Sequence, residues 1–157
     1  MPDQRPPRLV GDERATLHAL LQYQRDSVVR KVTGVSDADA RRPIVPTETT
    51  LLWVVKHLAH AETQWILRRF AGLDVELPDD TVRPDDTVAT AVETYRRTWS
   101  RGDAVVAAAS LDAACADVGE DPPVNLRWVL AHLLEETARH AGHADILREL
   151  VDGATGR

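Results

Sequence analysis

The stretch that decides the fold is VNLRWVLAHLLEETARHAGHADILRELVDG, residues 124–153. Its apolar residues recur at intervals of three and four, which is the spacing of one face of an α-helix, and Gly153 follows as a stop signal. The pattern predicts a long helix over about Val124 to Val151. When each residue is turned by about 100° around the helix axis, His140 falls inside the apolar stripe and Glu136 lies about 40° to one side. Because burying an unpartnered carboxylate is costly, Glu136 needs a base or a cation beside it.

Two more long helices are predicted in the first half of the chain. One begins after an N-cap at Asp12 and ends at Gly34, with an apolar stripe along one face. A short helical turn is expected in SDADARR, residues 36–42, before two prolines break the chain. The second long helix is expected to cover about Thr49 to Phe70.

A third helix is predicted after an extended crossover. Residues 73–86 hold two prolines and several aspartates, and this composition predicts extended chain with an N-cap at Asp85 or Asp86. Gly102 is expected to kink or interrupt the helix that follows, and residues 111–123 form a second irregular link. Four long helices with uneven connections predict an all-α fold, a four-helix bundle with a long crossover.

Length and charge narrow the class of protein. A chain of 157 residues fits one domain, residues 1–157, with residues 1–10 as a flexible N-terminal arm. The net charge is −6 and no basic stripe is present, so we expect no nucleic-acid partner. The single cysteine, Cys115, forms no intramolecular disulfide, and neither a signal peptide nor a run of the ~20 apolar residues that span a bilayer is evident. These features predict a cytoplasmic protein without a membrane partner.

Two segments of the sequence resemble each other, and we call this internal similarity the echo. WVVKHLAHAE, which begins at Trp53, and WVLAHLLEET, which begins at Trp128, align in register with an offset of 75 residues. An old duplication of a helical hairpin would explain this echo, and so would chance resemblance between two amphipathic helices. The echo alone does not decide between them.

Side chains of two predicted helices have the spacing of metal ligands. Glu136 and His140 are four residues apart on one helical face, so they can converge on one ion. His57 lies at the edge of the apolar arc of the second long helix and can face them. Two imidazoles and one carboxylate suit Zn²⁺, Ni²⁺ or Fe²⁺ and leave a coordination position open for water or substrate.

Other interpretations of these histidines remain open at this point. The pair on the last helix could be a plain intrahelical hydrogen bond within a structural interface. His132 has the same spacing to Glu136 and echoes the histidine of the second helix, while His60 and His143 lie close by in sequence. His18, on the first helix, is most simply a partly buried structural residue.

Residues 49–62, TTLLWVVKHLAHAE, and residues 125–153 resemble the DinB-like superfamily of four-helix metal proteins, especially an actinobacterial branch ending in an RHxGHxDxLRExxDG-like signature. The positions that fit this signature are Arg139, His140, Gly142, His143, Asp145, Leu147, Arg148, Glu149, Asp152 and Gly153. The resemblance implies that His57, Glu136 and His140 bind the metal. Many members have a histidine in place of the glutamate, but the related mycothiol-dependent maleylpyruvate isomerases carry a glutamate there.

The resemblance also implies a chemistry. Characterised relatives are enzymes whose metal activates a low-molecular-weight thiol, mycothiol or bacillithiol, for transfer to an electrophilic substrate. We expect one domain and not the additional C-terminal domain of the isomerases, so isomerase activity does not follow from the resemblance. Cys115 is expected to be a small buried apolar residue rather than a nucleophile.

Three functions remain: a metal-dependent thiol S-transferase, a bundle that a metal only stabilises, and an interaction module with a polar core. For the first, we expect a substrate pocket lined by Trp53, His60 and His143, with His143 as a candidate catalytic base. A homodimer is also expected, with Tyr95, Trp99 and the alanine-rich end of the third helix as its contact patch.

Overall fold

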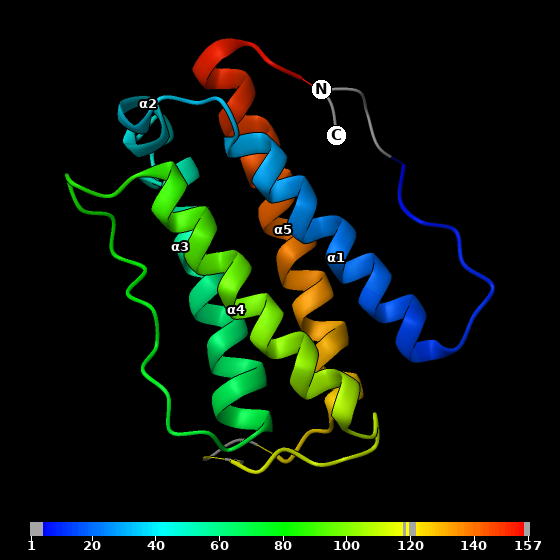
Figure 1. Ribbon diagram of the computed structural model, residues 1–157. Helices are drawn as coiled ribbons and strands as arrows, with labels where there is room; N and C mark the ends of the chain where they lie inside the picture. The colour runs from blue at the N-terminus through cyan, green and yellow to red at the C-terminus, as the bar shows by residue number, and fades with distance from the viewer. Residues whose placement is uncertain (1–4, 118, 120–121, 156–157) are drawn as a thin grey trace.

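Four long helices make up the molecule (Figure 1). The computed structural model describes residues 5–117, 119 and 122–155. The helices are α1 (Glu13–Val32), the short α2 (Asp37–Arg41), α3 (Leu51–Glu62), which continues as the π-helix η1 (Thr63–Phe70), α4 (Val88–Ala108) and α5 (Leu126–Asp152). The predicted all-α bundle is therefore confirmed. None of the helices within the described residues is long and apolar enough to cross a membrane.

The helix ends follow the capping residues, with one correction. Asp12 accepts a hydrogen bond from the Ala15 backbone N–H, and Gly153 ends α5 in the left-handed conformation at φ 76°. The predicted cap of α4 at Asp85 or Asp86 is wrong, because Thr87 caps that helix. The Asp86 carboxylate instead accepts hydrogen bonds from the Lys56 ammonium group of α3 and from the backbone N–H of Arg83 in the crossover.

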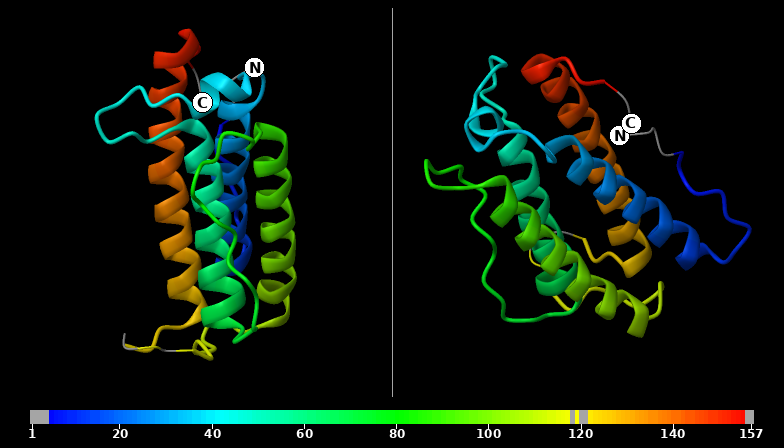
Figure 2. Two further views of the ribbon diagram at one scale, coloured as in Figure 1. Left: turned by 90° about the vertical axis from the view of Figure 1, so that its left-hand side faces the viewer. Right: turned by 45° about the horizontal axis from the view of Figure 1, so that its top comes forward.

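The topology of the bundle explains its long crossover. Figures 1 and 2 show α1 and α5 running in one direction and α3 and α4 in the other. α1 packs along α5, α4 packs along α3, and α3 also contacts α5. Because α3 and α4 are parallel, residues 71–87 must return the chain along the whole length of the bundle without helix or strand.

The last turns of the second long helix differ from the prediction. Residues 63–70 form a π-helix where a continuous α-helix was expected. At its start, the Thr63 hydroxyl donates a 2.9 Å hydrogen bond to the Ala59 carbonyl and so competes with the backbone for this acceptor. Gly102 of the facing helix α4 does not interrupt that helix, contrary to expectation, and a Cβ at Gly102 would lie 3.2 Å from the Ile66 side chain. The small residue admits the wide turns of η1.

The core consists of two hydrophobic clusters, one toward each end of the bundle. α3 supplies Leu51, Val54, Val55 and Leu58 to the first cluster, and α5 supplies Leu126, Val129, Leu130 and Leu133 to the second. These eight side chains are at most 1% exposed. Each cluster thus draws on the first turns of one of the two central helices.

Buried polar residues link α1, α3 and α4. Arg25 of α1 is 0% exposed and binds Glu62 of α3 through two hydrogen bonds of 2.9 and 2.7 Å, and Asp103 of α4 at 2.9 Å. Burial disfavours the charged guanidinium, but Glu62 outweighs it and holds the pKa of Arg25 above its ordinary value. Tyr95 is also 0% exposed, so its expected place in a dimer contact patch is wrong.

Candidate metal centre

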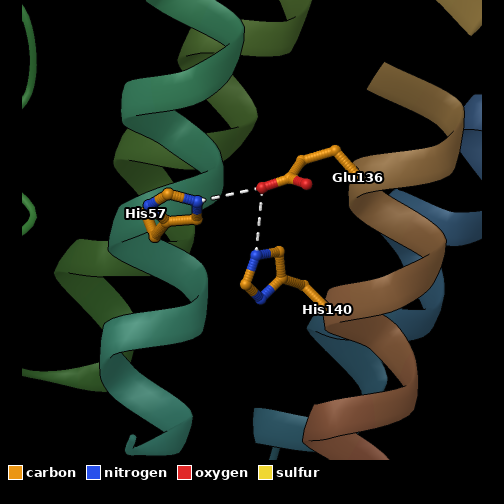
Figure 3. Close-up of side chains that lie close together, drawn as sticks. All are labelled: His57, Glu136 and His140. Atoms are coloured by element: carbon orange, nitrogen blue, oxygen red, sulfur yellow. Dashed lines mark hydrogen bonds and ion pairs between the residues drawn. The ribbon is translucent and has the colours of Figure 1, made fainter. Parts of the chain in front are cut away.

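Three side chains from two helices converge on one point (Figure 3). His57 comes from α3, and Glu136 and His140 come from α5. The Nε2 atoms of both histidines lie 3.1 Å from the Oε1 atom of Glu136. One ligand atom of each side chain lies within 4.8 Å of the other two. Two imidazole nitrogens and one carboxylate oxygen at this spacing fit a divalent ion and leave room for a further ligand.

The protonation states of the cluster also fit a metal. Burial disfavours the ionised form of Glu136, but its hydrogen bond with His57 and the nearby His140 outweigh this and hold the pKa of Glu136 below its ordinary value. Burial lowers the pKa of His140 below its ordinary value, although Glu136 opposes that shift. An ionised carboxylate and a neutral imidazole are the forms that bind metal ions, so little proton release is needed at neutral pH.

His57 is oriented by residues on both sides of its ring. Its Nδ1 atom lies 3.4 Å from the Oδ2 atom of Asp80 in the crossover, and Trp53 stacks on the ring at a centroid distance of 4.6 Å. A carboxylate behind the remote nitrogen of a metal-binding histidine fixes the tautomer and makes the ligand more basic. Asp80 therefore belongs to the site, although sequence reasoning missed it.

The crossover is held against α3 on both sides of this contact. The Lys56 ammonium group donates to the Thr81 carbonyl, and the Nδ1 atom of His60 lies 2.9 Å from the Pro78 carbonyl oxygen. These contacts bring Asp80 to the metal centre. His60 thus contacts the crossover and lies outside the cluster of three.

His132 and His18 have different neighbours. His132, the alternative ligand, lies between Trp65 and Trp128, with centroid distances of 4.7 and 4.9 Å. His18 forms a 3.2 Å contact with Asp103, in keeping with the structural role expected for it. Neither belongs to the cluster of three in the described part of the chain.

Two pockets lie beside the cluster. The His143 pocket has a volume of about 370 Å³ and is lined by Val45, Thr47, Thr49, His143, Ile146 and Leu147. The Trp53 pocket has a volume of about 400 Å³ and is lined by Arg41, Pro43, Glu48, Thr50, Trp53, Thr81 and Val82. The His143 ring lies 5.3 Å from that of His140, and the Trp53 ring stacks on that of His57, so each pocket is lined by a neighbour of one histidine of the cluster.

The loop between α2 and α3 contributes to both pockets. Within it, Glu48 has a φ of 59°, the left-handed conformation that residues with side chains rarely adopt. Such backbone strain is concentrated at functional sites. The sequence carries no signal for it, because the strain depends on how the loop is packed. Trp53 and His143 were expected to line one pocket, but each of them lines a different pocket.

Comparison with known proteins assigns the chain to a family. The family model for Mycothiol-S-transferase matches residues 16–153. The chain belongs to this family. The mycothiol-S-transferase family is DinB-like, which confirms the resemblance seen in the sequence, and it implies a thiol substrate. The matched residues include His57, Glu136 and His140. Their side chains offer ligand atoms that fit a divalent metal ion.

A solved structure shares the fold of this mycothiol-S-transferase family member. It is described as the conserved protein of locus from Enterococcus faecalis, and it aligns with a TM-score of 0.61 at 18% sequence identity. The alignment covers 92% of this chain and 100% of that chain. At this identity the likeness shows the fold alone. A search of curated proteins finds no match.

Proposed function

We propose that the protein is a metal-dependent thiol S-transferase, which joins a low-molecular-weight thiol of the mycothiol or bacillithiol type to an electrophilic small molecule. The observation that carries the proposal is the convergence of His57, Glu136 and His140 in a chain of the Mycothiol-S-transferase family. Zn²⁺ suits two imidazoles and a carboxylate best, and Ni²⁺ or Fe²⁺ are the alternatives.

The cluster is suited to favouring a thiolate. Two neutral imidazoles and one carboxylate carry a single negative charge, so a bound divalent ion would retain positive charge and favour a thiolate over a thiol at neutral pH. Asp80 holds the ring of His57 with Nε2 toward Glu136. The aromatic face of Trp53 restricts the same ring and covers one side of the site.

His143 is placed to accept the proton of the thiol. It follows His140 by one turn, is exposed to its pocket, and belongs to no ion pair among the described residues. In the proposed reaction the thiol proton passes to this imidazole, the sulfur bonds to the electrophilic carbon, and the leaving group departs with its electron pair. A general base of this kind contributes on the order of 10²-fold to the rate.

The two pockets suit the two substrates. Val45, Ile146 and Leu147 give the His143 pocket an apolar wall, which suits an apolar electrophile. Arg41 and Glu48 supply the Trp53 pocket with charges, and two threonines supply hydroxyl groups; both suit the polar part of the thiol.

The first test is metal content. Protein purified without a histidine tag or chelator should contain one divalent ion per chain by elemental analysis. Glu136→Gln should lower the affinity at least about 10²-fold, because loss of an outer partner alone costs 10–100-fold. Glu135→Gln is the matched control, since Glu135 points to Arg139 on the exposed side of the helix. Equal metal content in both variants would contradict the assignment of the ligands.

The second test is thiol binding. The Co²⁺-substituted protein should develop a sulfur-to-metal charge-transfer band when titrated with mycothiol or bacillithiol, with glutathione as a comparison. A metal that only stabilises the bundle would give no band with any of these thiols, and the transferase proposal would then fail. His143→Ala should retain the metal and the band while losing rate. Loss of the metal from this variant would assign His143 to ligand support instead.

A further inference from the structure

The helices of the bundle start in two matched pairs. α1 begins at Glu13 and α4 at Val88, whereas α3 begins at Leu51 and α5 at Leu126, so both pairs are 75 residues apart. The N-caps keep the same offset, and each cap side chain accepts a hydrogen bond from the backbone N–H three residues on. These caps are Asp12 and Thr87 for the first pair, and Thr50 and Asn125 for the second.

The packing of the helices keeps this correspondence. When α1 is exchanged with α4 and α3 with α5, the contact of α1 with α5 becomes the contact of α4 with α3, and both are present. Four of the six residues that α3 gives to the first hydrophobic cluster lie 75 positions before the four that α5 gives to the second. Glu62 and Thr137, also 75 residues apart, are 1% and 0% exposed. The correspondence thus has the form of a two-fold exchange of the two central helices.

The aromatic residues of the metal centre have counterparts under this exchange. Trp53 stacks on His57 at 4.6 Å with an interplanar angle of 15°. Trp128 stacks on His132 at 4.9 Å with the same angle of 15°. Both pairs are four residues apart on an α-helix, so the matched positions carry the same residue types in the same stacked geometry.

A third ring packs against each stacked pair, and these two rings correspond as well. His140 lies 5.5 Å from the tryptophan and 4.8 Å from the histidine of the metal centre. Trp65, which is 75 residues earlier, lies 5.2 Å and 4.7 Å from the tryptophan and histidine of the other cluster. The position of Glu136 corresponds to Ala61.

We propose that the chain is a duplicated two-helix unit and that Trp65, Trp128 and His132 mark the degenerate counterpart of the metal centre, a site for a divalent cation that has lost two of its three ligands. Only His132 keeps a donor atom, because Ala61 and Trp65 stand where Glu136 and His140 stand in α5. The ligand chemistry expected of this counterpart rests on the proposed function of the first site.

A positive charge also occupies the counterpart. The guanidinium carbon of Arg69 lies 4.6 Å from the Trp65 ring, where a cation would be repelled. The corresponding residue of α5 is Ala144, which is fully buried and uncharged. The π-helix η1 covers these positions, whereas α5 remains α-helical over residues 138–145. Three substitutions would therefore give α3 and η1 the side chains that α5 carries: Ala61→Glu, Trp65→His and Arg69→Ala.

The test installs these three changes in the full chain and measures Zn²⁺ by elemental analysis after dialysis. The triple variant should bind one more equivalent than its parent, and a further His132→Ala substitution should abolish the additional binding. A matched control moves the histidine out of register, with Gln64→His in place of Trp65→His, and should bind no additional zinc. Circular dichroism establishes that each variant is folded.

The same changes are made in a His57→Ala/His140→Ala background, where the first site is removed. One equivalent of zinc in that background supports the duplication, whether or not the wild-type chain binds zinc. Absence of zinc from the wild-type chain would contradict only the proposed function. If the glutamate prevents folding, Ala61→His with Trp65→His and Arg69→Ala replaces it. A folded variant of either kind that binds no more zinc than its parent and the out-of-register control overturns the proposal.

Discussion

At the scale of single residues, Asp80 is the contact through which the crossover reaches the metal centre. Asp80→Asn should lower zinc affinity about 10–100-fold, because an amide behind His57 no longer raises the basicity of its ring. Competition with a chromophoric chelator measures the affinity. Asp85→Asn, at an exposed position of the same segment, is the control and should leave affinity unchanged. Equal affinities for the two variants would show that Asp80 does not support His57.

The three proposed ligands and their supporting residue differ in how far the sequence predicts them. Glu136 and His140 follow from helical periodicity, because a helix fixes which positions share a face. The prediction of His57 as a ligand required a second helix that faces the first, and apolar periodicity predicted that helix too. Asp80 lies in a segment without periodicity, and its position depends on the contacts of the crossover with α3. Only the folded chain reveals it.

At the scale of the helices, two glycines should respond to substitution in opposite ways. Gly142 lies within α5, and a Cβ there meets no atom within 4 Å, so Gly142→Ala should raise the free energy of unfolding by about 0.5–1 kcal/mol. Gly102→Leu should lower it by about 1–3 kcal/mol, because the new side chain enters the space of Ile66. Urea unfolding compares the two variants. Stabilisation by leucine at Gly102 would show that η1 does not need the small residue.

The presence of the long helices could be predicted from the sequence, but the cap of α4 and the π-helix could not. Apolar periodicity located every long helix, since burying one face is what stabilises it. The cap of α4 was misplaced because Asp85, Asp86 and Thr87 are all good capping residues, and Lys56, distant in sequence, recruits one aspartate. The π-helix also escaped prediction, because it depends on the space that Gly102 leaves for Ile66.

At the scale of the whole molecule, the buried ion pair links three helices. Glu62→Ala should destabilise the fold by about 3–5 kcal/mol, because it leaves Arg25 charged and buried with Asp103 as its remaining carboxylate partner. The double variant Arg25→Met/Glu62→Leu should recover much of this loss, since it removes both charges. Thermal and urea unfolding measure both variants. A double variant that is less stable than the single one would contradict this account.

Assembly is the other prediction at this scale. A homodimer remains our expectation, although the burial of Tyr95 excludes this residue from the contact patch. Ile146 and Leu150 of α5 are 58% and 56% exposed and offer an apolar surface. Sedimentation should show a dimer at micromolar concentration that Leu150→Glu dissociates. A wild-type species of 17.4 kDa under these conditions would contradict the prediction.

The pairing of α1 with α5 also determines when the chain can acquire its structure during synthesis. α1 packs on α5, so its apolar face has no partner until α5 has been translated. Glu136 and His140 are also synthesised with α5. Until then the nascent chain exposes the apolar face of α1, which favours aggregation, and it lacks two of the three proposed metal ligands.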